Sequence, residues 1–382
     1  MGALSHLKVL DLSRVLAGPW ASQMLADFGA DVIKVEHPQR GDDTRKWGPP
    51  FLHDGDGELT AESAYFSCAN RNKRSAAIDM QTAEGQDQIR QLASEADVLL
   101  ENFKVGGLER YGLDYQSLAK TNPRLIYCSI TGFGQTGPYK DRPGYDFLVQ
   151  AMGGLMSVTG EPEGEPQKVG VALTDIMTGL YAANGILAAL AERERSGLGQ
   201  HVDLALLDVT AATLANQASN YLVGGQVPSR LGNAHPNIVP YQAFATADGH
   251  CIIAVGNDAQ FQRLLEVLGL EELKSDVRFL RNQDRVANRE ILVDLLQRAL
   301  LSNGKTYWLQ RLEDAGVPAG PINNVDEVFS DPQILARDMV VTLPHSLGGS
   351  VAMAGNPIKL SRTPVSYRTA PPTLGEHDPR WQ

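Results

Sequence analysis

Short runs of β-branched and apolar residues alternate with amphipathic segments along the first third of the chain. Strand-like runs lie at residues 7–12, 31–35, 76–78, 97–100 and 124–130, and helical periodicity occupies residues 20–28 and 84–94. Strands that alternate with helices are typical of βαβ units, in which a helix carries the chain back across a parallel sheet. The pattern therefore predicts an α/β fold with a mainly parallel, helix-covered sheet.

Glycine and proline crowd residues 132–144, which predicts a long functional loop after the strand that ends near residue 130. Two helical patterns follow, and the second has a face of small residues that permits close packing of another chain or a ligand. A hairpin turned at Asp248 and Gly249 comes next. The ranges are 144–155 and 174–194 for these two helices, 243–255 for the hairpin, and 260–268, 289–300 and 306–315 for three later helices.

The domain organisation is predicted from chain length and from a change in composition. At 382 residues the chain exceeds the length at which one core normally stops growing. Residues 223–228 contain a Gly-Gly pair and a proline, as linkers often do. We therefore predict a large Rossmann-like domain over residues 1–225, a smaller α/β domain over 226–321, and a return to the large domain over 322–382.

The charge and the cysteine content limit which partners the protein can bind. The chain carries 45 acidic and 34 basic residues, a formal net charge of −11, which repels nucleic acids and anionic membrane surfaces. Cys68, Cys128 and Cys251 lie far apart, without disulfide or C-x-x-C metal spacing, and are predicted to be reduced core residues. No apolar stretch looks long enough to span a membrane. We expect a cytoplasmic protein with no nucleic acid, membrane or metal partner.

One glycine motif suggests a dinucleotide site, but its context differs. GFGQTG at residues 132–137 matches the pattern G-x-G-x-x-G. In Rossmann enzymes these glycines open a helix that faces the pyrophosphate, whereas Pro138 and Pro143 interrupt the segment that follows here. The patterns H-E-x-x-H and G-x-S-x-G do not occur. Nicotinamide, metalloprotease and serine-hydrolase chemistry are therefore not favoured.

The remaining candidate is Asp175, at a strand-to-helix turn within VALTDIMTG at residues 171–179. Taken alone, such an aspartate is more often a helix-start residue that complements the helix dipole. Other segments of the sequence are therefore needed to distinguish a catalytic aspartate from a helix-start residue.

Five segments spread over nearly the whole chain resemble the class III CoA transferases of the formyl-CoA and carnitine CoA-transferase type, which share their fold with α-methylacyl-CoA racemases. The segments are RVLAGP at 14–19, GADVIKVE at 29–36, NKRS at 72–75, ENF at 101–103 and GVALTD at 170–175. The resemblance implies that Asp175 is the catalytic nucleophile. It also implies an interlocked homodimer, in which each chain threads the other.

The same resemblance implies where coenzyme A, as part of the acyl-CoA substrate, contacts the chain. The implied contacts are Leu16, Ala17, His37, Ile78, Asp79, Met80, Asn102, Phe103, Lys104, Arg110, Tyr145 and Asp146. Formyl-CoA enzymes have Gln at the position of Leu16 and Arg at that of His37. The missing positive charge is then expected from Lys73, Arg74 or Arg110.

The implied chemistry suits a carboxylate. Asp175 attacks the thioester to form a mixed anhydride, and the released CoA thiolate then attacks it to give an aspartyl-CoA thioester. This mechanism requires an ionised and well-aimed nucleophile, which a helix N-terminus favours. It requires neither a general base nor a metal.

Two other activities stay open: a CoA-ester racemase and a non-catalytic CoA-binding homologue. Racemases of this fold read Gly-His-Asp where this chain reads Gly144-Tyr145-Asp146. The reference pKa of tyrosine is near ~10 and that of histidine near ~6.5, so tyrosine is the poorer base at neutral pH. Transferase is therefore favoured over racemase.

Further segments most resemble the succinate-hydroxymethylglutarate CoA transferases, at residues 41–50, 127–132, 238–244 and 316–329. The likeness suggests succinyl-CoA as donor and a short dicarboxylic acid as acceptor. A second substrate carboxylate would require a cation, for which Arg45 and Arg230 are candidates, although an arginine in either position is more often an ordinary surface charge. His235 and Tyr241 are candidates for closing the acyl site, with ordinary loop residues as the alternative.

Overall fold

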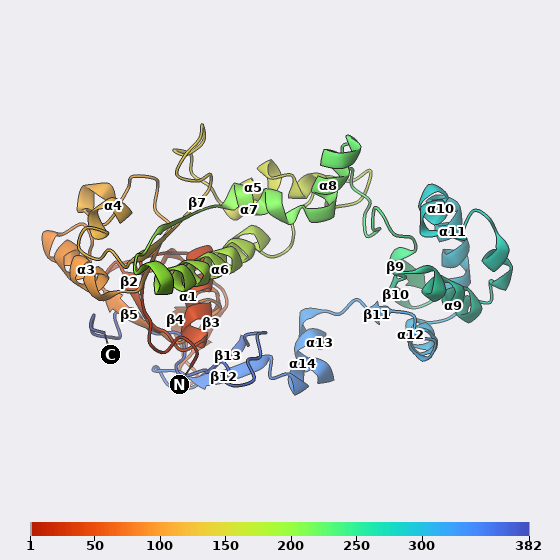
Figure 1. Ribbon diagram of the computed structural model, residues 1–382. Helices are drawn as coiled ribbons and strands as arrows, with labels where there is room; N and C mark the ends of the chain where they lie inside the picture. Colours follow the sequence, from red (N-terminus) through yellow and green to blue (C-terminus); the bar gives the residue numbers. More distant parts are fainter. Residues whose placement is uncertain (1, 382) are drawn as a thin grey trace. The chain divides into compact units, whose positions relative to one another are not determined.

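Six parallel strands form the main sheet of the computed structural model, which describes residues 2–381 (Figure 1). The strand order is β5-β2-β1-β6-β7-β8, and every neighbouring pair is parallel. The strands are β1 (Lys8–Asp11), β2 (Asp31–Glu36), β5 (Lys73–Ala77), β6 (Val98–Glu101), β7 (Ile126–Thr131) and β8 (His201–Ala205). The α/β fold predicted from the sequence is confirmed.

Alternate residues of each central strand enter opposite cores. Val9 and Leu100 belong to the cluster that contains residues of α1 (Ala17–Asp27) and α6 (Leu173–Ser196). Leu10 and Leu99 belong to the other cluster, with residues of α3 (Ala83–Glu95). Both faces of the sheet are therefore covered by helices, which explains why its strands read as short, continuous apolar runs.

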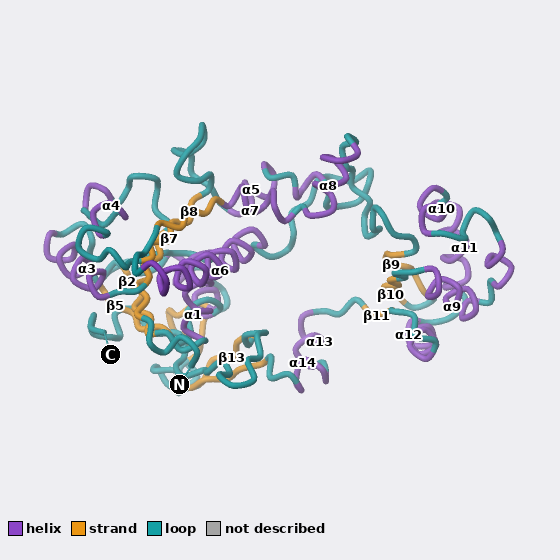
Figure 2. The backbone as a smooth tube through the Cα atoms, viewed as in Figure 1, coloured by secondary structure: helices purple, strands orange, loops and turns teal. Residues whose placement is uncertain are grey.

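Helix α6 corrects two expectations from the sequence. It has 24 residues and passes the length and hydropathy test for a membrane span, although no such stretch was expected. Its small-residue face packs within this chain: a Cβ added at Gly179 would lie 2.7 Å from the Ala17 carbonyl oxygen of α1. Ala182, Ile186 and Ala189 are buried in the core beside the sheet. The close packing predicted for another chain or a ligand is thus made to α1, and Figure 2 shows the two helices side by side.

The chain divides into two compact units. The first comprises residues 1–155, 168–224 and 332–382, and the second comprises 156–167 and 225–331. Besides the elements above, the first unit contains β3 (Phe51–His53), β4 (Leu59–Ser63), α2 (Ala64–Ser67), α4 (Tyr115–Leu118), α5 (Asp146–Met152), α7 (Leu206–Thr213), α8 (Ala215–Gly224), α14 (Pro332–Ala336), β12 (Val340–Pro344) and β13 (Ser350–Ala354). The domain boundaries drawn from the sequence stay a prediction.

The second unit has its own antiparallel sheet and core. Its elements are β9 (Tyr241–Thr246), β10 (Gly249–Ala254), β11 (Ala319–Pro321), α9 (Asp258–Leu268), α10 (Asn282–Ala287), α11 (Arg289–Leu300), α12 (Lys305–Asp314) and α13 (Val325–Ser330). Thr246 pairs with Gly249, so the hairpin turns at Ala247 and Asp248, one residue earlier than predicted.

The cysteines divide between core and surface. Cys128 and Cys251 are buried, as predicted, whereas Cys68 is exposed at the end of α2, which corrects the expectation of a core position.

Candidate active site

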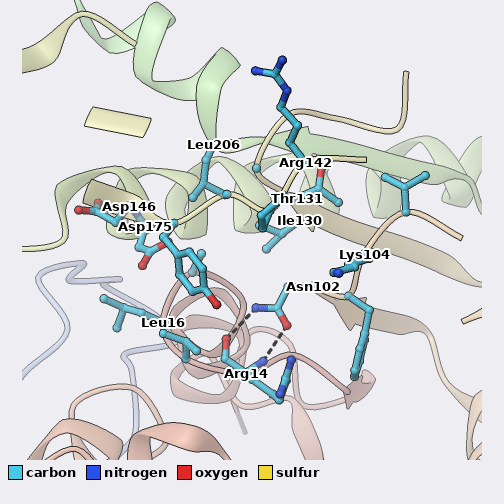
Figure 3. Close-up of a pocket in the computed structure, with 18 of the residues that line it drawn as sticks. Arg14, Leu16, Asn102, Lys104, Ile130, Thr131, Arg142, Asp146, Asp175 and Leu206 are labelled. Atoms are coloured by element: carbon cyan, nitrogen blue, oxygen red, sulfur yellow. Dashed lines mark hydrogen bonds between the residues drawn. The ribbon is translucent and has the colours of Figure 1, made fainter. Parts of the chain in front are cut away.

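A cavity of about 580 Å³ opens within the first unit at the carboxyl ends of β1, β6 and β7. In open parallel sheets ligands bind at this edge, because the loops that follow neighbouring strands converge there. Figure 3 shows residues from these loops around one space together with Asp175. The cavity is lined by residues 14–17 after β1, 102–105 after β6, 130–132 and 140–146 after β7, and by Asp43, Trp47, Asp175 and Leu206.

Asp175 lies in the first turn of α6, but it does not cap that helix. The cap is supplied by Asp146, whose Oδ1 accepts hydrogen bonds from the backbone N–H groups of Thr174 at 2.8 Å and Asp175 at 3.3 Å. Within residues 2–381, no side chain or backbone group donates a hydrogen bond to the Asp175 carboxylate. Its carboxylate therefore faces the cavity without a partner, as an attacking group requires.

Burial, and secondly the nearby Asp146 carboxylate, raise the pKa of Asp175 to about 7. The N-terminus of α6 favours the charged form of Asp175, but the Thr174 N–H at this end donates to Asp146 instead. Asp175 is thus poised between its two protonation states near neutral pH. Perturbation of a carboxyl group by burial and by a second acid is typical of functional sites.

The 132–144 loop is closed at its base by two glycines, which we call the glycine neck. A Cβ added at Gly132 would lie 2.5 Å from the Gly144 Cα, and one added at Gly144 would lie 2.3 Å from the Gly132 Cα. Only residues without a side chain allow this approach. The neck places Tyr145 and Asp146 directly beside the end of β7, so the first glycine of the G-x-G-x-x-G pattern serves to close this loop.

Most of the residues that the resemblance assigned to coenzyme A lie at this cavity or at a second one that adjoins it. Leu16, Ala17, Asn102, Phe103, Lys104, Tyr145 and Asp146 line the first cavity. His37, Ile78, Asp79 and Met80 line the second, of about 130 Å³. Arg14, Asp43 and Phe103 line both cavities, so the two adjoin.

Three predicted cations do not line either cavity. Lys73 is fully buried, with its Nζ 3.1 Å from the Asp11 carboxylate and 2.8 Å from the Asn70 side chain. Arg74 binds both carboxylate oxygens of Asp31. The Arg110 guanidinium lies over the Tyr111 ring, 4.6 Å from its centroid.

The candidates for a second substrate carboxylate are also engaged. Arg45 donates through Nε and Nη2 to Glu36 and through Nη1 to Glu62, in buried ion pairs. In the second unit, Arg230 donates to the carbonyl oxygens of residues 161, 162 and 164. The rings of His235 and Tyr241 lie 5.3 Å apart, centroid to centroid. Roles for these four residues in substrate binding stay predictions.

Sequence reasoning missed three cations that do line the cavity. Arg14 pairs with Asp43 at 3.1 Å, Arg142 lies over the Tyr139 ring, and Lys140 comes from the same loop. The sequence could have indicated them, because Arg14 follows the first strand and Lys140 and Arg142 lie in the glycine-rich loop. Figure 3 shows the Lys104 ammonium, by contrast, directed toward the middle of the cavity.

Comparison with known proteins adds four findings. The model of CoA-transferase family III matches residues 4–378. The chain is 54% identical over 374 residues to the succinate–glutarate CoA-transferase of Agrobacterium fabrum, covering 98% of this chain and 93% of that protein. It is 44% identical over 377 residues to the succinyl-CoA:glutarate CoA-transferase of Mus musculus, covering 99% and 85%. The crystal structure of a CAIB/BAIF family protein from Brucella suis is similar at a TM-score of 0.86 and 53% identity, covering 98% and 97%.

Proposed function

Because the chain belongs to CoA-transferase family III and is a CoA transferase, we propose that it moves CoA from succinyl-CoA to a short dicarboxylic acid through covalent intermediates on Asp175. The observation that carries the proposal is the unpartnered Asp175 carboxylate in a cavity lined by the CoA-assigned residues. The names of the relatives, which specify succinate or succinyl-CoA and glutarate, support the choice of substrates.

In the proposed reaction each step exchanges one acyl bond for another. An Asp175 oxygen attacks the thioester carbonyl carbon of succinyl-CoA, the C–S bond breaks, and CoA leaves as a thiolate, so that a mixed anhydride joins succinate to Asp175. The thiolate then attacks the Asp175 carbonyl carbon, which releases succinate and leaves an aspartyl-CoA thioester. The acceptor carboxylate attacks that thioester, and the same two steps in reverse give the new acyl-CoA and free Asp175.

We place coenzyme A along the two adjoining cavities. Leu16 and Ala17 start α1, whose first N–H groups favour an anionic ligand. Lys104 lines the first cavity and pairs with no acidic side chain among residues 2–381, so it is a cation available to the CoA phosphates. Arg14 contributes beside it.

The second carboxylate of a dicarboxylic acid requires a cation that still has free donors. The contacts of Arg45 disfavour it, because all three of its nitrogens already donate to Glu36 or Glu62. Arg142 and Lys140 line the cavity and replace Arg45 in our proposal. Arg230, His235 and Tyr241 remain candidates from the second unit.

We also propose a homodimer. Apolar side chains are exposed on α8, where Leu222 is 78% and Val223 89% exposed, and on α5, where Phe147 is 59% exposed. Exposed apolar side chains of this size mark an interaction surface rather than a solvated one. A second copy of the chain would bury them.

Trapping of the intermediate tests the proposed function. After incubation with succinyl-CoA, mass spectrometry of the peptide that contains Asp175 should detect a CoA adduct, and hydroxylamine should convert it to a hydroxamate. The Asp175→Asn variant should form no adduct and lose transfer by a factor of at least ~10³, since it lacks the nucleophile.

The same incubation separates the alternatives. Full transfer by Asp175→Asn would refute the covalent mechanism, while deuterium uptake at the α-carbon of a 2-methylacyl-CoA without CoA exchange would favour a racemase. A panel of carboxylic acids with succinyl-CoA identifies the acceptor, and C4 to C6 dicarboxylates are expected to react best.

A further inference from the structure

Val15 has an unusual backbone conformation at the edge of the first cavity. Its φ is +70°, in the left-handed region that β-branched residues strongly avoid. Val15 belongs to the turn of residues 13–17, which connects β1 to α1 and lines the cavity with Arg14, Leu16 and Ala17. Such a conformation persists only where the surroundings hold it, so the turn must be held by specific contacts.

The holding contact is made by the carboxylate of Asp42. Both of its oxygens lie 3.2 Å from the Val15 backbone nitrogen, which donates to them. The Oδ1 atom also accepts from the backbone N–H and the hydroxyl of Thr44, at 3.0 and 2.8 Å. Its Oδ2 lies 2.9 Å from Lys34 Nζ, and both side chains are 0% exposed.

Two other side chains hold the backbone of the two residues that precede Val15. Lys34 Nζ donates to the Ser13 carbonyl oxygen at 2.8 Å. The Asn102 amide accepts from the Arg14 N–H at 2.9 Å and donates to the Arg14 carbonyl at 2.8 Å. Three consecutive residues of the turn are therefore fixed by side chains from β2, from the loop after β2 and from the loop after β6.

We propose that Asp42 is a positioning residue for CoA transfer, acting through the Val15 backbone to hold the 13–17 turn against the cavity. This inference rests on the proposed function, because Leu16 and Ala17 matter only if CoA binds beside Asp175. Asp42 borders the second cavity, but its side chain is 0% exposed, so we assign its carboxylate to the turn and not to the substrate. Buried ion pairs of this kind contribute little net stability, so a role in specifying local geometry explains the Lys34–Asp42 pair better than a role in stability.

A double-mutant cycle between positions 42 and 15 tests the proposal. Asp42→Asn keeps the size of the side chain but turns one acceptor into a donor, so it cannot accept from Val15, Thr44 and Lys34 together. Val15→Gly removes the steric penalty of the left-handed conformation, because glycine adopts it readily. In the wild-type background Asp42→Asn should weaken CoA binding and lower kcat/KM for the acyl-CoA by about thirtyfold. In the Val15→Gly background the same change should cost only a few-fold.

The matched control is Asp27→Asn. Asp27 is also a buried carboxylate in an ion pair, with Arg71, but it lies at the other end of α1. The Asp27→Asn variant should lower the melting temperature and show no coupling to Val15→Gly.

Calorimetric titration with free CoA measures binding independently of transfer activity. The effects of the two substitutions on CoA affinity could be coupled while the wild type transfers no CoA from succinyl-CoA. That result would support the positioning role and refute the proposed substrate.

The positioning role is refuted if Asp42→Asn costs the same factor in both backgrounds, measured on samples that remain folded by circular dichroism. It is also refuted if Asp42→Asn lowers the melting temperature while CoA affinity and kcat/KM stay unchanged. If Asp42→Asn fails to fold, the milder Thr44→Val, which removes one donor to the same carboxylate, serves in its place. Its loss of CoA affinity should likewise shrink in the Val15→Gly background.

Discussion

Two neighbouring carboxylates define the proposed chemistry at the residue scale. Asp146 accepts from the N–H groups at the start of α6, and burial together with the Asp146 charge raises the pKa of Asp175 to about 7. In the proposed mechanism only the ionised form of Asp175 attacks the thioester. Its pKa is raised, so the reactive fraction is small at pH 5.5 and nearly complete at pH 8.5.

We therefore expect the rate of adduct formation on Asp175 to rise with pH through about 7 and then level off. Asp146→Asn removes the like charge and keeps an acceptor for the helix cap, so the midpoint should move down by roughly one pH unit. Single-turnover measurements with succinyl-CoA between pH 5 and 9 provide the test. An unchanged midpoint in Asp146→Asn would contradict the coupling of these two acids.

Asp175 could be identified from the sequence because the motif around it is continuous. The sequence did not reveal which charged side chains form ion pairs with distant residues. Lys73 meets Asp11, and Arg45 meets Glu36, only after β1, β2 and β5 have aligned in one sheet. The partners of a side chain that are distant in sequence do not follow from its immediate neighbours. Free cations and paired cations therefore look alike in the sequence.

At the scale of elements, the contact of α1 with α6 sets the distance between the CoA-assigned turn and Asp175. Gly179 lies one helical turn after Asp175 and leaves no room for a methyl group against the Ala17 carbonyl. Any side chain at this position must separate the two helices. The first turn of α1 and the first turn of α6 both line the cavity, so their separation alters the site itself.

Gly179→Ala should therefore destabilise the protein by about 1–3 kcal/mol, since overpacking exceeds the gain of about 1 kcal/mol in helix propensity. It should also lower kcat/KM by about tenfold or more. Gly185→Ala on the same helix is the control, because its added methyl would meet only a Val202 methyl, at 3.0 Å. Thermal unfolding and steady-state kinetics compare the two variants. Equal behaviour of both would contradict the close-packing argument.

Elements with a strong apolar pattern could be predicted, whereas strands that bury few residues could not. The buried strands β1, β2, β6 and β7 and the helices α3, α9, α11 and α12 lie close to the positions that the apolar pattern predicted. Strand β8 was missed because it lies at the edge of the sheet and is only partly buried. Strands β12 and β13 were missed because they pair only with each other and bury few residues.

At the scale of the whole molecule, the proposed homodimer rests on the exposed apolar side chains of α5 and α8. Leu222→Asp places a charge within this surface, and the desolvation of that charge opposes association. Light scattering should find a dimer for the wild type and an increased monomer fraction for the variant. Leu59→Asp on β4, where the leucine is 64% exposed, is the matched control and should remain dimeric. A monomeric wild type at micromolar concentration would contradict the proposed homodimer.

The glycine neck has a consequence for how this protein can change. Because Gly132 and Gly144 touch, the ends of the loop between them are fixed whatever the loop contains. A longer loop costs little extra closure entropy, since that cost grows only with the logarithm of length. Residues 133–143, which bring Lys140 and Arg142 to the cavity, can therefore be exchanged or extended while Asp146 and Asp175 keep their places. In our proposal, in which Lys140 and Arg142 bind the acceptor, acceptor preference is therefore separable from acyl transfer, and grafting of this loop between relatives should change the acceptor.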